Sequence, residues 1–486
     1  MRNNLILAAA VAATFAGVSA SASTVDIYVS GSSALQTFFQ KDLAVSICGQ
    51  AATAISSSNI SVSYKDTTLA STAGQPGYTY YSCVANGTVS GFASGNIYAL
   101  HYASDLGSTW GVAGSITPSL TRETILTNVG CGTSTCNDTA HFDRVNDKSA
   151  ALEAAYVMGQ HKSDILTFDV EPTLFSGDNW PSANSDVTII PAKLATAPTA
   201  AQLAGITTSN MNEQIFGVIV SNNTPGVGLS TGNATGSTST QAPSLSTNSI
   251  RAIFTGQYTY WNQVPEVGSA DTASTQIVLC RRDHGSGSEI AASLTFTGVE
   301  CGVNSNAIAT TASSGNLNGV IENPTSQDVK NCVQSTSSVS GLSGAVAGIG
   351  LVGIGFSASY TTVNIDGYQA NAHNVAAGLY NMAYESHAKD NTANSGASAD
   401  TKAVVSALLL DATKQAKLTN FYSETATQLA AAASNQFNVA STPAGYTALQ
   451  AGNTASVIGS SFISNKTPVV LFDRGGNSCT AKSNSN

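Results

Sequence analysis

Residues 276–288 read QIVLCRRDHGSGS, an apolar stretch followed by a charged and then a small-residue loop. Gln276–Leu279 has the composition of a strand, and the residues after the loop favour a helix. A Gly/Ser loop between a strand and a helix exposes backbone N–H groups, and the helix dipole adds about half a positive charge. Ser286 and Ser288 would add hydroxyl donors, and Arg282 a planar fork of N–H groups that fits an oxyanion. Taken alone, the loop fits an ordinary turn with a helix cap equally well.

The same order of elements opens the chain after its first 22 residues. Val25–Val29 alternates apolar and polar residues, as a half-buried strand does. Gly31-Ser32-Ser33-Ala34 follows, and Leu35–Val45 has helical spacing. This loop is a second candidate for anion contacts, although by itself a capped helix start is the simpler explanation.

A third candidate is Asp169, which ends the apolar strand Asp164–Phe168 and precedes Val170-Glu171-Pro172. A carboxylate beside an anion site is repulsive unless the ligand still carries a proton. Phosphate carries one near neutral pH and sulfate does not. A buried Asp169 would therefore accept a hydrogen bond from phosphate, but would make the binding free energy of sulfate less favourable by several kcal/mol. The alternative is an ordinary loop or cap aspartate.

Strands and helices alternate along the rest of the chain, which indicates α/β layers. The chain is too long for one sheet of ordinary size, so we expect two α/β lobes. The further strands expected are Ile60–Tyr64, Ile215–Val220 and Val469–Phe472, and the further helices are Ala150–Met158, Ile250–Phe254 and Thr401–Tyr422.

Three segments fit this pattern less well. Residues 65–142 are rich in Ser, Thr, Gly and Tyr, and we interpret them as an insertion of loops and hairpins. Pro225–Ser246 has low complexity and is expected to be a loop. Leu342–Ala358 is a Gly-rich apolar run, for which a buried strand pair or helix is favoured over a membrane helix because so many glycines weaken a helix.

The N-terminus has the features of a secretory signal. Arg2 precedes the apolar run Leu5–Val18, and Ala20-Ser21-Ala22 is a cleavage site of small residues. We therefore expect a signal peptide over residues 1–22, a mature protein that begins at Ser23, and a periplasmic or secreted location. An N-terminal membrane anchor is the alternative, but a spanning helix needs about 20 apolar residues.

Composition restricts the classes of partner. The net charge is −10 and only 10% of residues are charged, so nothing indicates a basic nucleic-acid surface. The negative balance does not exclude an anion ligand, because distant surface charge is screened over about 10 Å. The six His are scattered and no CxxC occurs, so we expect no metal and no cofactor.

Eight cysteines behind a signal peptide indicate disulfides. Cys131 with Cys136 and Cys280 with Cys301 are plausible local pairs. Eight cysteines allow 105 pairings, so the sequence leaves the connectivity open.

Several stretches, in order, resemble the periplasmic phosphate-binding proteins of ABC phosphate importers. VDIYVSGSSAL at 25–35 is similar to that family's first strand and loop, and SDILTFD at 163–169 to its D-F-G-A-S-D strand end. IFTGQYTYWNQV at 253–264 and RDHGSGS at 282–288 are similar to its G-x-I-x-x-W segment and its R-x-D-G-S-G-T loop. Further on, Gly348–Phe356 is similar to its A-I-G-Y run, and Ile365–Gly367 with Gly378–Tyr380 to its V-D-G and G-x-Y-P segments.

The resemblance implies a type 2 periplasmic-binding fold, with a ligand cleft between two lobes. We expect lobe 1 to comprise 23–218 and 357–486, with the insertion at about 65–142, and lobe 2 to comprise 219–356. Asp169 would take the phosphate proton. The other ligand-binding residues implied by position are Ser32, Ser33, Ala34 and Ser149 of the first lobe and Arg282, Ser286, Gly287 and Ser288 of the second.

His284 departs from the family, which usually has an Asp there that helps to hold the Arg. Asp283, one position earlier, is a candidate to replace it, and His284 leaves the choice of ligand open.

Three function classes follow from these residues. The first is a monomeric, exported, non-enzymatic protein that binds phosphate or a similar oxyanion and, as the resemblance implies, delivers it to an ABC importer. The second is a secreted surface or adhesive protein of the same fold that has lost or changed its ligand. A hydrolase using Ser286 with His284 is disfavoured, since no acidic orienting residue or nucleophile elbow is evident.

Overall fold

The computed structural model describes residues 23–50, 60–66, 77–127, 136–137, 142–147, 156–181, 194–226, 244–302, 307–310, 319–335, 342, 344–353, 360–368, 370, 375, 379–411, 438–440, 472–473, 478–479 and 483–484. The predicted signal peptide, Ser149, Cys131 and most of the predicted loop at 225–246 lie outside these residues. Within the described part, no helix is both long enough and apolar enough to span a bilayer.

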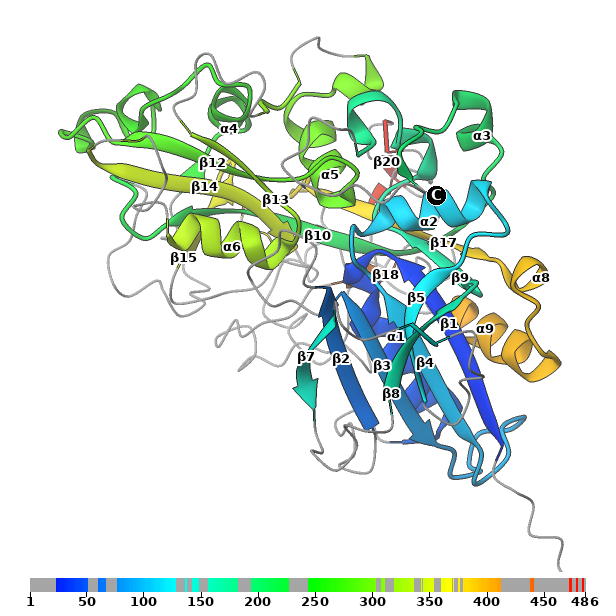
Figure 1. Ribbon diagram of the computed structural model, residues 1–486. Coiled ribbons are helices and arrows are strands. Elements are labelled where there is room, and N and C mark those ends of the chain that lie inside the picture. The colour runs from blue at the N-terminus through cyan, green and yellow to red at the C-terminus, as the bar shows by residue number, and fades with distance from the viewer. Residues whose placement is uncertain are drawn as a thin grey trace, which may run out of the picture.

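A 13-stranded sheet runs through the protein (Figure 1). Its main path is β13 (Val320–Asn323), β12 (Gln276–Arg282), β14 (Val346–Gly353), β10 (Ser209–Ser221), β17 (Ala383–Asp390), β9 (Ile165–Phe168), β1 (Thr24–Gly31), β4 (Ile97–Ala103), β3 (Tyr78–Val84), β2 (Ile60–Asp66) and β7 (Phe142–Asp147). Off this path, β15 (Tyr360–Thr362) and β18 (Asn438–Ala440) pair with β10.

Smaller sheets and helices surround it. The small sheets are β5 (Arg122–Thr127), β8 (Tyr156–His161) and β6 (Cys136–Asn137); β11 (Ser244–Leu245) with β16 (Asn364–Ile365); and β19 (Phe472–Asp473) with β20 (Ser483–Asn484). The helices are α1 (Gln36–Asp42), α2 (Ser108–Ile116), α3 (Ala200–Ala204), α4 (Thr247–Phe254), α5 (Gly287–Phe296), α6 (Ser326–Gln334), α8 (Thr392–Ser395) and α9 (Ala399–Asp411).

Two long strands carry the sheet from one half to the other. Residues 209–215 of β10 pair with β17, whereas residues 216–220 pair with β14. β17 in turn pairs with β9 at residues 387–390. We call the half with β1–β4, β7 and β9 the first lobe and the half with β12–β15 the second. The predicted α/β class is thus confirmed, while the predicted boundaries at 218 and 356 stay predictions.

The second lobe has a doubly covered sheet. Ile277 and Leu279 of β12 lie in one apolar cluster with residues of α4 and α5. Val278 and Cys280, which point to the opposite face, pack with Val329 of α6. Burial on both faces explains why this strand reads as a continuous apolar run.

The first lobe is covered differently on its two faces. Val25 and Ile27 of β1 pack in a cluster with residues of α1 and α9. On the other face, Ala99 of β4 packs with Ile125 of β5 and Met158 of β8. Helices therefore cover one face of the sheet and a small antiparallel sheet covers the other.

The expected insertion at 65–142 is wrong in part. β3 and β4 do form a hairpin, but β4 also pairs in parallel with β1 in the body of the sheet, and α2 follows it. The predicted helix 150–158 is wrong over Tyr156–Met158, which belong to β8. Pairing with β5 and burial of Met158 outweigh its helical propensity.

One predicted cysteine pair is also wrong. Cys280 points toward α6 and is bonded to Cys332, not to Cys301. The other disulfides described are Cys48–Cys83 and Cys301–Cys479. The predicted Cys131–Cys136 pair lies outside the described residues.

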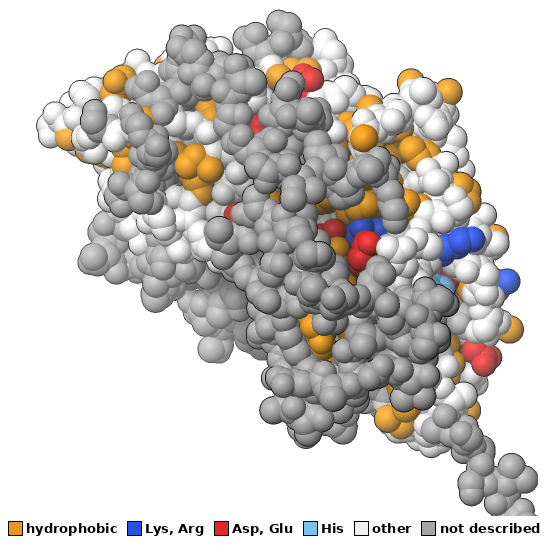
Figure 2. All heavy atoms as spheres, viewed as in Figure 1, with side chains coloured by type: hydrophobic (Ala, Val, Ile, Leu, Met, Phe, Trp, Pro, Cys, Tyr) orange, Lys and Arg blue, Asp and Glu red, His pale blue; other side chains and the backbone are white. Residues whose placement is uncertain are grey.

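Figure 2 shows one face of the molecule, on which the described charged side chains are few and scattered among uncharged ones. This agrees with a sequence in which only 10% of residues are charged.

Candidate functional site

The candidate site begins where three parallel strands of the first lobe end. β1 pairs in parallel with both β4 and β9, so the carboxyl ends of all three strands lie at one edge of the sheet. Ser32 follows β1, Asp169 follows β9, and Ser108 starts the helix after β4. In open α/β sheets, ligands bind at such ends where neighbouring connections leave in opposite directions.

Asp169 accepts hydrogen bonds from the other two residues at this edge and is 8% exposed. The Ser32 hydroxyl donates to its Oδ1 atom, and the Ser108 hydroxyl donates to its Oδ2 atom at 3.0 Å. The backbone N–H of Asp169 donates to the Ser108 Oγ atom, also at 3.0 Å. The carboxylate is therefore held in one orientation by two buried hydroxyls.

Burial raises the pKa of Asp169 above its ordinary value, and the hydrogen bonds from Ser32 and Ser108 and the charge of Arg282 offset part of that rise. The raised pKa means that this carboxylate gains from accepting a proton or a proton-bearing partner.

The second lobe contributes the turn between β12 and α5. Gly285 has φ of +82°, and a Cβ atom added there would lie 2.2 Å from Thr109 Oγ1 and 2.6 Å from Pro181 Cδ. Ser286 is the N-cap residue of α5, but its side chain makes no capping hydrogen bond. Its Oγ atom lies 2.8 Å from Ser288 Oγ instead. The first turn of α5 therefore has no side-chain cap.

The two lobes touch directly at this turn. A Cβ atom added to Gly287 would lie 2.4 Å from Asp169 Cβ and 2.5 Å from its Oδ2 atom, so the aspartate packs against the first residue of α5. The Thr109 hydroxyl donates to the backbone oxygen of Gly285 at 2.7 Å. Asp169, Ser32 and Ser108 are thus brought together with the Ser286–Ser288 turn.

Arg282 lies beside this turn and has protein partners for all five of its N–H groups. Nε donates to Asn323 O at 3.1 Å, and Nη2 donates to Pro324 O at 2.8 Å. Nη1 donates to Ser326 Oγ at 3.2 Å. The two remaining bonds, to Ser288 Oγ and Asp283 Oδ1, are both 3.4 Å long. An anion at the guanidinium would have to replace these two weaker bonds.

A buried ionic cluster lies behind the turn. Arg281 Nη2 is 2.6 Å from Glu289 Oε1. Burial raises the pKa of Asp283 to about 7, with Glu322 adding to the rise and Arg282 opposing it. Burial likewise raises the pKa of Glu289 to about 7, and Arg281 opposes that rise.

His284 bridges the lobes. Its Nδ1 atom faces the backbone oxygen of Asp178 in the first lobe, and its Nε2 atom lies 3.6 Å from Glu322 Oε1. Both ring nitrogens therefore face groups other than Ser286.

The remaining predicted residues lie apart from this contact or outside the described part. The Ser33 side chain is exposed, and the Ala34 N–H already donates to Ser32 Oγ at 3.2 Å. Ser149 is not among the described residues.

Ser108 is the first residue of α2, and its hydroxyl donates to Asp169 at this edge, but the sequence interpretation did not include it; Ser149 stays a prediction. Ser108 was missed because β4 was assigned to an insertion. The signal was present: Ile97–Ala103 is an apolar stretch, and Gly107-Ser108 follows it in front of a helix.

Within the part of the chain that the structure describes, no group of three or more His, Cys, Asp or Glu residues could hold a metal ion.

No family model and no curated protein matches the chain. Solved structures do. A proposed phosphate ABC transporter substrate-binding protein with bound phosphate, from Clostridium perfringens, has 11% identity and a TM-score of 0.39 over 84% of this chain and 100% of that one. An ABC-type phosphate transport receptor from Vibrio cholerae has 12% identity and a TM-score of 0.35, over 79% and 93%. PstS from Borrelia burgdorferi has 9% identity and a TM-score of 0.31, over 79% and 92%.

The three are described as phosphate-binding or phosphate-transport proteins of the kind that the sequence resembles. At 9–12% identity, the similarity transfers no ligand and no residue role to this chain.

Proposed function

We propose that this protein binds a small oxyanion that still carries a proton, with phosphate as the expected ligand, at the junction of its two lobes. We further propose that it is an exported, monomeric binding protein for an ABC importer and not an enzyme. The observation that supports the ligand is the position of Asp169. This buried carboxylate, held by two hydroxyls, lies directly against the first residue of α5.

The α5 turn supplies the attraction for an anion. The first N–H groups of any α-helix lack partners within the helix, and the helix dipole makes this end positive. At α5 the N-cap side chain does not satisfy them, and the hydroxyls of Ser286 and Ser288 lie beside them. Each charge-assisted hydrogen bond contributes about 1.5–3 kcal/mol net, so a handful would suffice for micromolar binding.

Asp169 supplies the selectivity. Its carboxylate would accept the proton of a phosphate ion as a short hydrogen bond, whereas sulfate would place like charges together in a buried site. The raised pKa of Asp169 supports this role, because it reports a carboxylate that gains from receiving a proton.

Export and delivery to an importer rest on the resemblance and on the signal-like N-terminus rather than on the site. The expected location is the periplasm or the cell exterior.

Titration calorimetry with phosphate and with sulfate tests the proposal. Wild-type protein is expected to bind phosphate and to bind sulfate at least 100-fold more weakly. Arg282→Ala should remove most phosphate affinity, and Asp169→Asn should bring the two affinities together. Asp400→Asn and Lys402→Ala, exposed on α9, are the matched controls and should behave as wild type. Equal binding of both anions by wild-type protein would refute the role of Asp169.

A second candidate is a protein of this fold that no longer binds an anion. It is favoured by the five protein partners of Arg282 and by the direct Thr109–Gly285 contact, which together describe a junction already satisfied without a ligand. The absence of any thermal shift with phosphate, arsenate and sulfate would favour this candidate.

A further inference from the structure

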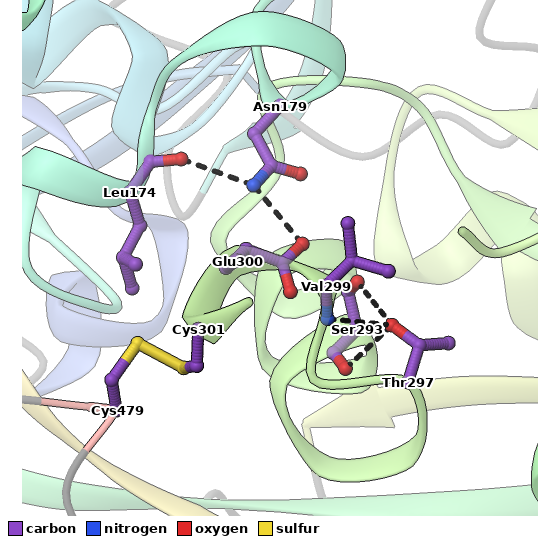
Figure 3. The surroundings of a disulfide bond; sticks show 8 residues. All are labelled: Leu174, Asn179, Ser293, Thr297, Val299, Glu300, Cys301 and Cys479. Atoms are coloured by element: carbon purple, nitrogen blue, oxygen red, sulfur yellow. Dashed lines mark hydrogen bonds between the residues drawn. A yellow bond between two sulfur atoms is a disulfide. The ribbon is translucent and has the colours of Figure 1, made fainter. Parts of the chain in front are cut away.

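The C-terminal residues Ser478 and Cys479 join parts of the chain that are far apart in sequence. Cys479 is bonded to Cys301, 178 residues earlier, in the short turn η11 (Val299–Cys301) that follows α5 (Figure 3). Ser478 is buried, and its backbone hydrogen-bonds to the Glu171 carboxylate. Glu171 lies two residues after Asp169. One residue of this pair is thus bonded covalently to the second lobe, and its neighbour is bonded to the segment that leaves the candidate site in the first.

A second link lies beside the first. The Asn179 Nδ2 atom donates to Leu174 O at 3.0 Å and to Glu300 Oε1 at 3.1 Å. Glu300 immediately precedes Cys301, and Leu174 belongs to the same first-lobe segment as Glu171. Figure 3 shows Asn179 pointing between Leu174 and Glu300, with the disulfide nearby. The same two segments are therefore joined by two hydrogen-bonded connections, one directly through Asn179 and one through Ser478, whose neighbour Cys479 is bonded to Cys301.

The turn that carries Cys301 is fixed to α5. The Thr297 hydroxyl donates to Ser293 O at 2.9 Å and accepts from the Val299 N–H at 3.4 Å (Figure 3). Together these contacts connect η11, through Thr297, to the last turn of α5. Since α5 has ten residues and begins at the candidate site, one rigid helix of about 15 Å separates the site from the disulfide.

We propose that Cys301, Ser478 and Cys479 form a clasp that restrains separation of the two lobes. Opening the lobes about β10 and β17 would move η11 away from the Glu171–Asn179 segment. The disulfide keeps Ser478 attached to the second lobe. When the hydrogen bond between Ser478 and Glu171 breaks, the two groups stay at a high effective concentration and the bond re-forms. The clasp thereby favours the state in which Asp169 lies against α5.

The first test needs no ligand. In the paired variant Cys301→Ser/Cys479→Ser, amide hydrogen exchange at residues 171–181 and 285–289 is expected to rise at least tenfold, while exchange in β1 and β4 stays unchanged. The matched control is Cys48→Ser/Cys83→Ser, which removes a disulfide confined to the first lobe. Unchanged exchange in the clasp variant, or an equal rise at 285–289 in the control, would overturn the proposal.

A second pair of variants keeps the disulfide and guards against misfolding of the cysteine variants. Glu171→Ala and Asn179→Ala each remove one hydrogen-bonded connection and should raise exchange at 285–289 by a smaller factor. If neither does, the clasp does not restrain the junction.

A third test, which uses phosphate, rests on the proposed function. If wild-type protein binds phosphate, the clasp variant should release it at least tenfold faster in stopped-flow displacement. If wild-type protein binds no phosphate, the proposed function fails, but the exchange measurements still decide whether the clasp exists.

Discussion

Asp283 and Glu289 are buried carboxyls within the ionic cluster behind the α5 turn. In the unfolded chain both lose their protons near pH 4, but in the folded protein burial raises each pKa to about 7. The folded state therefore holds more protons between pH 4 and 7, and the free energy of unfolding falls as pH rises through this window. Since one pKa unit corresponds to about 1.4 kcal/mol, each carboxyl accounts for on the order of a few kcal/mol.

In Asp283→Asn, the free energy of unfolding should depend less steeply on pH than in wild-type protein. Urea unfolding at pH 5, 6, 7 and 8 measures it, and the exposed Asp400→Asn is the control. Identical slopes for Asp283→Asn and wild-type protein would show that Asp283 does not hold its proton in the folded state.

Single residues of the site were partly predictable. The sequence indicated Ser32, Asp169 and the Ser286–Ser288 turn, because each small or acidic residue follows an apolar strand. It did not indicate the partners that saturate Arg282, since Asn323, Pro324 and Ser326 are about 40 residues away in sequence and reach the guanidinium only through the pairing of β12 with β13.

The conformation of the turn between β12 and α5 depends on Gly285. Its positive φ and its contact with Thr109 and Pro181 both exclude a side chain. Gly396 has nearly the same φ, +81°, but a Cβ atom there would meet nothing within 4 Å. A comparison of alanine substitutions at Gly285 and Gly396 therefore separates the loss of stability due to backbone strain from the loss due to the contact between the lobes.

Gly396→Ala should cost about 1 kcal/mol of stability, the usual penalty for a left-handed residue. Gly285→Ala should cost clearly more and should also weaken phosphate binding, because the turn must move away from the first lobe. Urea unfolding and calorimetry measure both effects. Equal losses in the two variants would mean that the contact at Gly285 contributes nothing.

Elements were predictable where local pattern and tertiary environment agree. β1, β10, β12 and α5 contain the predicted segments, and β9 begins one residue after its predicted start, because their apolar residues follow a clear strand or helix pattern. Tyr156–Met158 was assigned to a helix and forms part of β8, since pairing with β5 decides its state. β4 was missed because residues 65–142 as a whole are rich in Ser, Thr, Gly and Tyr, although β4 itself is an apolar stretch that pairs with β1 and β3.

At the scale of the whole molecule, one apolar cluster extends across both lobes. It contains Trp110 and Trp180 of the first lobe and Trp261 of the second. A shared core opposes independent unfolding of the two halves. We therefore expect a single thermal transition, with tryptophan fluorescence and far-UV circular dichroism giving coincident curves. Two separate transitions, or curves that do not coincide, would contradict this expectation.

The division into two lobes followed from chain length and from the alternation of strands and helices, and the structure bears out the α/β class. The disulfide pattern could not be predicted, because Cys301 and Cys479 are 178 positions apart in the sequence and no local pattern pairs them. Local spacing favoured Cys280 with Cys301, whereas the alternation of side chains along β12 directs Cys280 to α6.

β10 has a consequence for how the protein moves. It is one unbroken strand of 13 residues, and its partner changes from β17 to β14 between Ile215 and Phe216. Any change in the angle between the lobes must therefore twist a backbone that β17 and β14 hold by hydrogen bonds. Such a strand resists rotation of the lobes elastically. We therefore expect the lobes to return to one resting angle when the force that rotates them is removed.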